Sequence, residues 1–195
     1  MTLDLRELDA LVLAPRAAAV DQNDHFVELY EDEAALARSV RTFMSIGHND
    51  GEAAVVIATP SHRDAIETEL AAAVDLVAAR AEGLYTALDA AETVSLFMDG
   101  DEVDPHAVNR VIGAVLTAAG RGGRRIRVFG EMVSLLWGEG NVSGALALED
   151  EWNELAKSHR FRLFCAYPSS VFGADDTAGL TGVCSRHSHV VVPAR

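Results

Sequence analysis

The polar side chains best placed for chemistry follow apolar runs that the sequence predicts to be β-strands. Glu131, for example, comes directly after the run 128–130, where a strand should give way to a helix. In an open α/β sheet, ligands bind outside the carboxyl ends of the strands, so polar residues at these positions are expected to share one edge. The candidate ligand-binding residues are Tyr30, His62, Arg63, Glu131, Trp137 and Tyr167.

A helix expected around residues 145–156 carries an apolar stripe that should face the core. Beside that stripe lie Glu149 and Asn153, four positions apart, where their side chains can interact. Two interpretations are open. In the first, this is an ordinary packed helix with polar residues beside its buried stripe. In the second, the helix forms one side of an apolar pocket, in which Trp137 or Trp152 is a wall beside a few polar groups.

The common catalytic motifs are missing. After the first predicted strand, at residues 29–35, a nucleotide-hydrolysing sheet needs a phosphate-binding Gly-x-x-x-x-Gly-Lys loop, but Glu31, Asp32 and Glu33 stand there instead. No Gly-x-Gly-x-x-Gly follows a predicted strand, and Gly-x-Ser-x-Gly is absent. Cys165 falls within an apolar run, where a thiol is usually buried and inert. The sequence therefore predicts a protein that is not an enzyme.

The strongest candidate metal ligands are Cys184, His187 and His189, which stand in the pattern Cys-x-x-His-x-His. Three such ligands can meet a zinc ion, but no second cluster in the sequence supplies a tetrahedral site with its fourth ligand. We therefore expect no metal and no cofactor, and expect these histidines to hydrogen-bond to the sheet.

Composition narrows the class of protein. The chain has 195 residues and a net charge of −14, with 49% hydrophobic residues, which fits one soluble domain with its own core. So acidic a chain lacks the basic face of a nucleic-acid binder, and its four clustered arginines, Arg121, Arg124, Arg125 and Arg127, are expected at exposed edges. Two cysteines, no signal peptide and no apolar run long enough to cross a bilayer predict a cytoplasmic protein.

The elements alternate along the chain. Strands are expected at His25–Tyr30, Ala53–Thr59, weakly near Asp75–Ala79, Leu84–Leu88, 128–130, Arg162–Tyr167 and, at an edge, Val190–Val192. Helices are expected from Asp32 to about Gly47, His62 to Ala72, Ala90 to Met98, 108 to 120, up to about His159, and Leu180 to Arg186. Asp32, Ser61 and Asp89 are the expected helix caps. Strands without polar alternation are typical of covered parallel sheets. We predict an α/β fold with a mainly parallel, doubly wound sheet over 25–195, after a leader and connector at 1–24.

Several short motifs occur in a particular order. They are His25-x-x-x-x-Tyr30, Gly47-His48-Asn49-Asp50-Gly51-Glu52, Ala58–Arg63, Arg127–Val133, Leu136-Trp137, Gly140-Asn141, Leu148-Glu149, Trp152-Asn153, Phe164–Pro168 and Cys184-x-x-His187. In this order and spacing, they resemble the MEDS domain, a sensory domain shared by methanogen and methylotroph regulators. The resemblance covers about His25 to His187.

The resemblance implies a RecA/KaiC-like three-layer sandwich that has lost its nucleotide loop. It implies a signalling role, since such domains are often joined to kinases, DNA-binding modules or anti-anti-sigma modules. It also implies a pocket for small ligands, proposed to be hydrocarbon derivatives, and it assigns no catalytic residues. The residues that we expect to have a structural or supporting role are His25, Asn141, Glu149, Trp152 and Asn153.

Our leading hypothesis is a non-catalytic cytoplasmic sensor that binds an unknown small molecule at the strand ends and regulates a protein partner. One alternative is a pure protein-interaction module in a histidine-kinase or sigma-factor pathway. Another is a domain that retains some nucleotide binding. Direct contact with nucleic acid or membrane is not expected, and a homo-oligomer remains open.

Overall fold

A parallel β-sheet forms the centre of the protein. The computed structural model describes residues 2–3, 23–173 and 176–191. The sheet has seven strands in the order β1-β9-β2-β8-β7-β3-β4, and every pair of neighbours is parallel. Its strands are β1 (Thr2–Leu3), β2 (His25–Tyr30), β3 (Ala53–Ala58), β4 (Tyr85–Asp89), β7 (Ile126–Gly130), β8 (Phe161–Pro168) and β9 (His189–Val191). The predicted parallel α/β class is confirmed.

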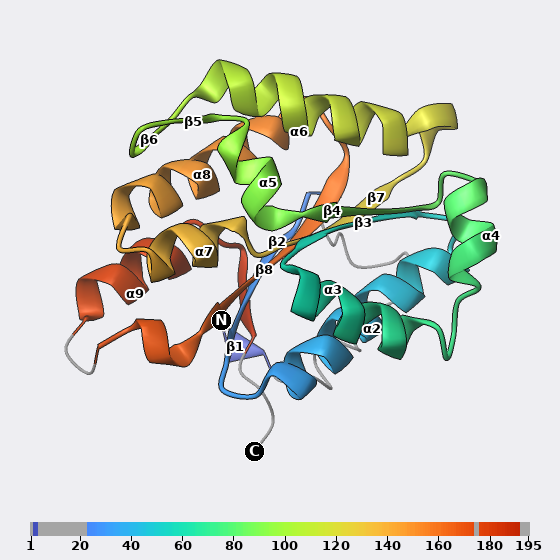
Figure 1. Ribbon diagram of the computed structural model, residues 1–195, viewed down its shortest axis with the longest axis horizontal. Coiled ribbons are helices and arrows are strands. Elements are labelled where there is room, and N and C mark those ends of the chain that lie inside the picture. Colours follow the sequence, from blue (N-terminus) through green and yellow to red (C-terminus); the bar gives the residue numbers. More distant parts are fainter. Residues whose placement is uncertain (1, 4–22, 174–175, 192–195) are drawn as a thin grey trace.

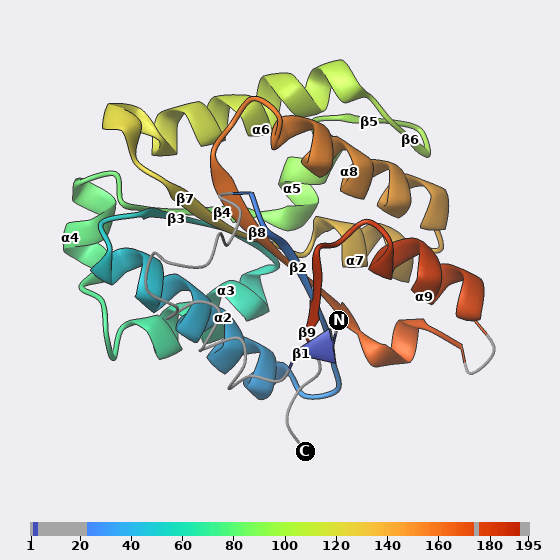
Figure 2. The same cartoon turned by 180° about the vertical axis from the view of Figure 1, so that it is seen from behind.

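Helices cover both faces of the sheet, which gives three layers (Figure 1). One face carries α2 (Glu33–Asn49), α3 (Pro60–Leu70) and α4 (Leu76–Ala81). The other carries α5 (Ala90–Ser95), α6 (Pro105–Ala119), α7 (Met132–Gly138), α8 (Val142–Leu155) and α9 (Thr177–Cys184). The view from behind shows the same division (Figure 2). A small antiparallel hairpin joins β5 (Met98–Asp99) to β6 (Glu102–Val103), and two 3₁₀ turns span Arg121–Gly123 and Ser169–Val171.

The handedness of the crossovers decides which helices cover which face. The chain runs from β2 past β8 and β7 to β3 and then to β4, before it returns through β7 and β8 to β9. Because such crossovers are almost always right-handed, the helices of the outward and return runs lie on opposite faces. β3 and β7 are neighbours, yet the chain leaves them in opposite directions. This is a topological switch point, where open α/β sheets bind their ligands.

The core confirms several predictions. All six residues of β3 are buried, as the run without polar alternation predicts. The apolar stripe of α8 is buried as well, and so is Cys165. Asp32 and Asp89 cap α2 and α5, where their carboxylates accept hydrogen bonds from backbone N–H groups. The first turns of α2 and α5 therefore each have a free amide satisfied by a side chain.

Three local predictions are wrong. The weak strand near residues 75–79 is instead helix α4, capped by Asp75, because a short apolar run does not distinguish the two structures. The helix predicted to reach Met98 ends at Ser95, and Met98 starts the hairpin. Thr59 rather than Ser61 holds the cap position of α3, where Pro60 fills the first turn without needing an N–H partner.

The N-terminus joins the sheet. Thr2 and Leu3 pair with Val190 and Val191, so β9 is not the edge strand that the sequence predicts. The other leader residues, 4–22, lie outside the described residues. Within residues 2–3, 23–173 and 176–191, no helix is both long and apolar enough to cross a membrane.

The sequence predicts Arg127 at an exposed edge, but the structure buries it. Arg127 is only 1% exposed. Its Nε donates to Glu52 at 2.6 Å and its Nη1 donates to the carbonyl of Phe43 at 2.8 Å. Gly47 makes room for it, since a Cβ at Gly47 would lie 2.6 Å from the Arg127 side chain. Gly51, at a φ of 72°, then turns the chain so that Glu52 faces the arginine. This part of the 47–52 motif therefore has a structural role.

The buried pair makes a prediction for stability. Replacing Glu52 with alanine leaves Arg127 charged and buried without its partner, and such losses cost about 3–5 kcal/mol. Urea denaturation of the Glu52→Ala variant measures the cost. The matched control is Glu154→Ala, which removes an exposed partner of Lys157 and should cost less than about 1 kcal/mol. Equal losses in the two variants would contradict the assignment.

Glu28 makes a prediction for pH dependence. It is fully buried on β2, where only Ser39 Oγ donates to it among the described contacts, at 3.3 Å, and burial raises its pKa to about 7. The stability that its protonated form contributes is complete below about pH 4.5 and is lost as pH rises through about 7.

Glu28→Gln stays neutral at every pH. Its stability relative to wild type should therefore rise between pH 4.5 and 7 and level off at up to about 3 kcal/mol. Urea melts of both proteins across this range test it. A difference that does not change with pH would show that burial does not raise the pKa of Glu28.

Candidate functional site

The Glu131 carboxylate lies at the switch point and joins the two loops that diverge there. Glu131 follows β7, and its oxygens accept hydrogen bonds from the backbone N–H of Thr59 and from Nδ1 of His62, both of which follow β3. Its own backbone N–H donates to Ile57 at 3.1 Å. The side chains of Glu131 and His62 are 4% and 14% exposed. Residues from two separate strand ends thus form one unit at the sheet edge.

Two further predicted residues lie around this unit. The ring of Tyr30, at the end of β2, meets His62 edge-on with ring centroids 6.2 Å apart. Arg63 turns instead toward the end of β4, where its Nη2 lies 3.6 Å from the carboxylate of Asp89. On the solvent side, Glu33 approaches His62 Nε2 at 3.8 Å. The structure therefore brings Tyr30, His62, Arg63 and Glu131 to the same edge.

The charges at this edge favour a protonated imidazole. The hydrogen bond to Glu131 raises the pKa of His62 above its usual value, against the opposing effect of partial burial, and the Glu33 carboxylate adds to the rise. Burial, with the negative charges of Glu131 and Glu33, raises the pKa of Tyr30 to about 12. At neutral pH the Tyr30 hydroxyl is therefore protonated. The hydrogen bond between His62 and Glu131 favours the charged form of His62.

Trp137 and Tyr167, the other two predicted residues, lie on the α7–α9 face of the sheet. Their rings pack edge to face with centroids 5.7 Å apart, and Trp137 also contacts Phe172. The Tyr167 hydroxyl donates to Glu149 Oε1 at 2.7 Å rather than reaching Glu131. The six candidates thus divide between two places in the fold.

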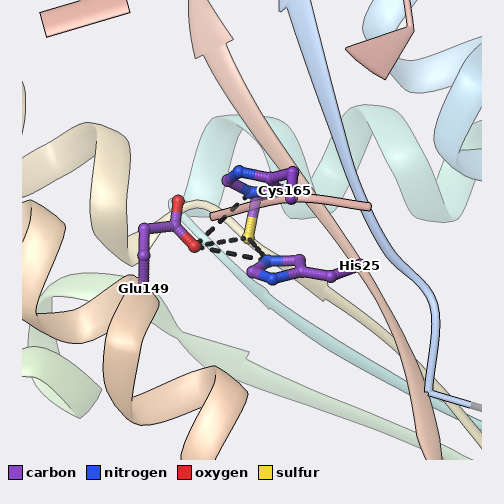
Figure 3. A group of neighbouring side chains, drawn as sticks. His25, Glu149 and Cys165 are labelled. Atoms are coloured by element: carbon purple, nitrogen blue, oxygen red, sulfur yellow. Dashed lines mark hydrogen bonds and ion pairs between the residues drawn. The ribbon is translucent and has the colours of Figure 1, made fainter. Parts of the chain in front are cut away.

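A second group of polar side chains is buried beneath α8, and it consists of His25, Glu149, Cys165 and His187. His25 comes from β2, Cys165 from β8 and Glu149 from α8, and their side chains converge on one point (Figure 3). In a strand, alternate residues face the same side, so Cys165 and Tyr167 share the face covered by α8. The potential ligand atoms of His25, Glu149, Cys165 and His187 all lie within 4.8 Å of one another.

The Glu149 carboxylate is the centre of this group. Its Oε2 lies 3.3 Å from His25 Nε2, 3.4 Å from His187 Nε2 and 3.7 Å from Cys165 Sγ. Burial raises the pKa of Glu149, but His187, His25 and the Tyr167 hydroxyl together lower it to about 2. Burial lowers the pKa of His187 to about 4. At neutral pH the carboxylate is therefore ionised and the imidazole of His187 is neutral.

Cys165 is not an activated nucleophile in this setting. Burial, followed by the charge and hydrogen bond of Glu149, raises the pKa of its thiol well above the usual value. The thiolate is the reactive form, and it is favoured by positive rather than negative neighbours. These surroundings therefore disfavour attack by Cys165 on a substrate.

Of Cys184, His187 and His189, the candidate metal ligands of the sequence, only His187 joins this group. His189 Nε2 lies 3.2 Å from Asp24 Oδ1, and its ring stacks on Phe26. Cys184 is partly exposed at the end of α9. Sequence reasoning missed that His25 and Cys165 join His187, because the three stand in different motifs. The period of two along β2 and β8 is the signal that could have suggested their shared face.

The remaining supporting residues have identifiable contacts. Asn141 caps α8, with its side chain accepting from Gly144 N at 2.8 Å and donating to the carbonyl of Asp101. Trp152 is buried and meets Phe161 edge-on. Asn153 accepts from His25 Nδ1 at 3.1 Å and donates to the carbonyl of Arg186.

Comparison with known protein families gives one result. Residues 24–185 match the family described as MEDS: MEthanogen/methylotroph, DcmR Sensory domain. The chain belongs to the MEDS family. No curated protein matches it. The match covers both polar groups of this MEDS domain, except for His187, which follows its end, and it confirms the resemblance drawn from the sequence motifs.

The edge of this MEDS domain makes a prediction for His62. Its raised pKa means that the stability contributed by the protonated imidazole is complete below about pH 6.5 and is lost as pH rises through the higher folded value. NMR titration of the His62 ring should show an apparent pKa above that of a free imidazole. The Glu131→Gln variant should shift it downward.

Glu33→Gln is the matched control, because Glu33 also faces His62 but its side chain is 78% exposed. Solvent screening should make its effect on the pKa of His62 the smaller of the two. A larger shift in Glu33→Gln than in Glu131→Gln would contradict the hydrogen-bond assignment.

Proposed function

We propose that this MEDS domain is a non-catalytic sensor that binds a small molecule at the carboxyl edge of its sheet and so regulates a protein partner. Its membership of a sensory-domain family supports the role. The observation that carries the site is the contact of Glu131 with both Thr59 and His62, which links the loops after β3 and β7.

A link of this kind suits a sensor because a ligand can replace it. A ligand that hydrogen-bonds to His62 or to Glu131 breaks the hydrogen bond between these two residues. The loop after β3 is then no longer held to the loop after β7 by that bond. A ligand signals only if it binds two conformations with different affinity. The closed link between His62 and Glu131 is one conformation, and a ligand-separated pair is the second.

The charge of this edge favours a neutral or cationic ligand. Glu31, Asp32 and Glu33 follow β2, and Glu131 adds a further carboxylate, so a phosphate or carboxylate ligand meets repulsion. The Tyr30 ring supplies an apolar surface beside His62. Small hydrocarbon derivatives combine a small apolar body with little or no negative charge, and they fit this setting.

The contacts at the edge do not favour catalysis. Both oxygens of Glu131 already accept hydrogen bonds, so neither is free to take a proton from a substrate. A general base has to be within reach of the proton that it removes. We therefore assign Glu131 to binding and to the conformational link.

The proposal predicts ligand-dependent stabilisation. In a thermal-shift and calorimetric screen of small halogenated and one-carbon compounds, dichloromethane and methanol among them, a ligand at 100 times its Kd should add about 2.7 kcal/mol to the free energy of unfolding. Glu131→Gln should abolish this gain, whereas Glu33→Gln, on the exposed side of His62, should retain it.

Two results would contradict the proposal. One is a screen in which no compound stabilises the protein. The other is a ligand that stabilises Glu131→Gln as much as wild type, since it would bind elsewhere.

A further inference from the structure

We propose that the buried group of His25, Glu149, Cys165 and His187 is a binding site for one divalent transition-metal ion of the zinc type. This site is separate from the sheet edge of the proposed function. The set of four contains two imidazoles, one thiol and one carboxylate, which are the ligand types that bind zinc in proteins.

Four of the six distances within the group fit a tetrahedral ion. Bonds of about 2.0–2.1 Å to nitrogen and oxygen and about 2.3 Å to sulfur place tetrahedral ligands about 3.3–3.7 Å apart. Four of the six pairs of ligand atoms are 3.3 Å and 3.4 Å from Glu149 Oε2 to His25 and His187, 3.7 Å from Oε2 to Cys165 Sγ, and 3.4 Å from His25 Nε2 to Sγ. The two remaining pairs, from His187 to His25 and to Cys165, lie within 4.8 Å. The group is therefore close to the size that an ion requires.

Both imidazoles are oriented as metal ligands. His187 Nδ1 donates to the carbonyl of Val183 at 2.8 Å, which directs its Nε2 toward Glu149. His25 Nδ1 donates to Asn153 Oδ1, and the bond from Asn153 Nδ2 to the carbonyl of Arg186 fixes which end of that amide accepts. Metal-binding histidines characteristically donate their second ring N–H to such an oxygen, which fixes the tautomer.

The centre of the group gathers several atoms that can bind a cation. His25 Nε2, His187 Nε2 and Glu149 Oε2 point inward, and the Cys165 sulfur lies 3.4 Å from His25 Nε2 and 3.7 Å from Glu149 Oε2. His187 Nε2, with a side chain that has no exposure, has no hydrogen-bond partner among the described residues. Buried polar atoms normally have a partner. A cation at the centre satisfies all of these atoms at once.

The ligand types also select the ion. Thiolate and imidazole favour zinc and its borderline neighbours over calcium or magnesium, which prefer oxygen ligands. On binding, the Cys165 S–H bond breaks, its proton leaves to solvent and the thiolate sulfur bonds to the metal. Four protein ligands leave no open position, which is the arrangement of a structural rather than a catalytic zinc site. The ion then ties together β2, α8, β8 and the segment after α9.

Metal titration of the full-length protein tests the site. After treatment with a chelator, the protein should bind one Zn²⁺ per chain by calorimetry and release a proton. Co²⁺ in place of Zn²⁺ should give the visible bands of a tetrahedral ion and a thiolate-to-cobalt charge-transfer band. Cys165→Ser should lose the charge-transfer band, and His187→Ala should weaken binding at least ten-fold.

The other cysteine supplies the matched control. The chain has two cysteines, Cys165 and Cys184, so a thiolate band in the Cys184→Ser variant has to come from Cys165. This readout remains decisive even if Cys165→Ser fails to fold. His189→Ala should likewise keep full affinity, whereas Asn153→Ala should keep the band and weaken binding about 10- to 100-fold, the usual effect of losing a residue that orients a ligand.

Two results would overturn the proposal. One is the absence of Zn²⁺ and Co²⁺ binding by the folded wild-type protein, which would mean that protons alone hold the group together. The other is a charge-transfer band that disappears in Cys184→Ser but persists in Cys165→Ser. That pattern would show that the ion binds at Cys184, at the end of α9, instead of in the buried group.

Discussion

The burial of charged groups in a parallel sheet that is covered on both faces is the constraint that organises this protein. Such a sheet offers little water, so each buried charge needs a partner from another element. Glu52 meets Arg127 beneath α2, Glu131 meets His62 at the strand ends, and Glu149 meets Tyr167 and two histidines beneath α8. These contacts join segments that the helices alone would leave independent. Their geometry therefore depends on the topology of the sheet and fixes where polar chemistry can occur.

The sequence predicts what depends on local pattern. The buried runs of β3 and β8 and the strand-end positions of His62 and Glu131 follow from apolar runs and from the rule that parallel strands share a carboxyl edge. Contacts across the sheet do not follow. His25 and His187 are brought together by the pairing of β2 with β8 and β9, and no local pattern encodes that neighbourhood. For the same reason Arg127, read as an exposed arginine, is in fact buried, because its partner lies on a distant turn.

The two polar groups of this MEDS domain are connected through α7. Glu131 precedes this helix and Trp137 lies in its last turn, where the indole packs on Tyr167, whose hydroxyl binds Glu149. Spatial continuity alone does not establish energetic coupling between two sites. The path does identify the contacts through α7 and Tyr167 that would transmit such coupling. If a ligand at one site changes affinity at the other, linkage requires the reverse effect to be equally large.

The start of α2 differs from that of a nucleotide-binding helix. In nucleotide-binding α/β proteins the helix after the first strand directs its free N–H groups and the positive end of its dipole at a phosphate. Here Asp32 accepts from the N–H of Ala34, and Glu33 places a second negative charge in the first turn. The protein's own carboxylates thus occupy the position of the anion. Negative charge at this strand end disfavours a phosphate, in agreement with the neutral or cationic ligand that we propose for this edge.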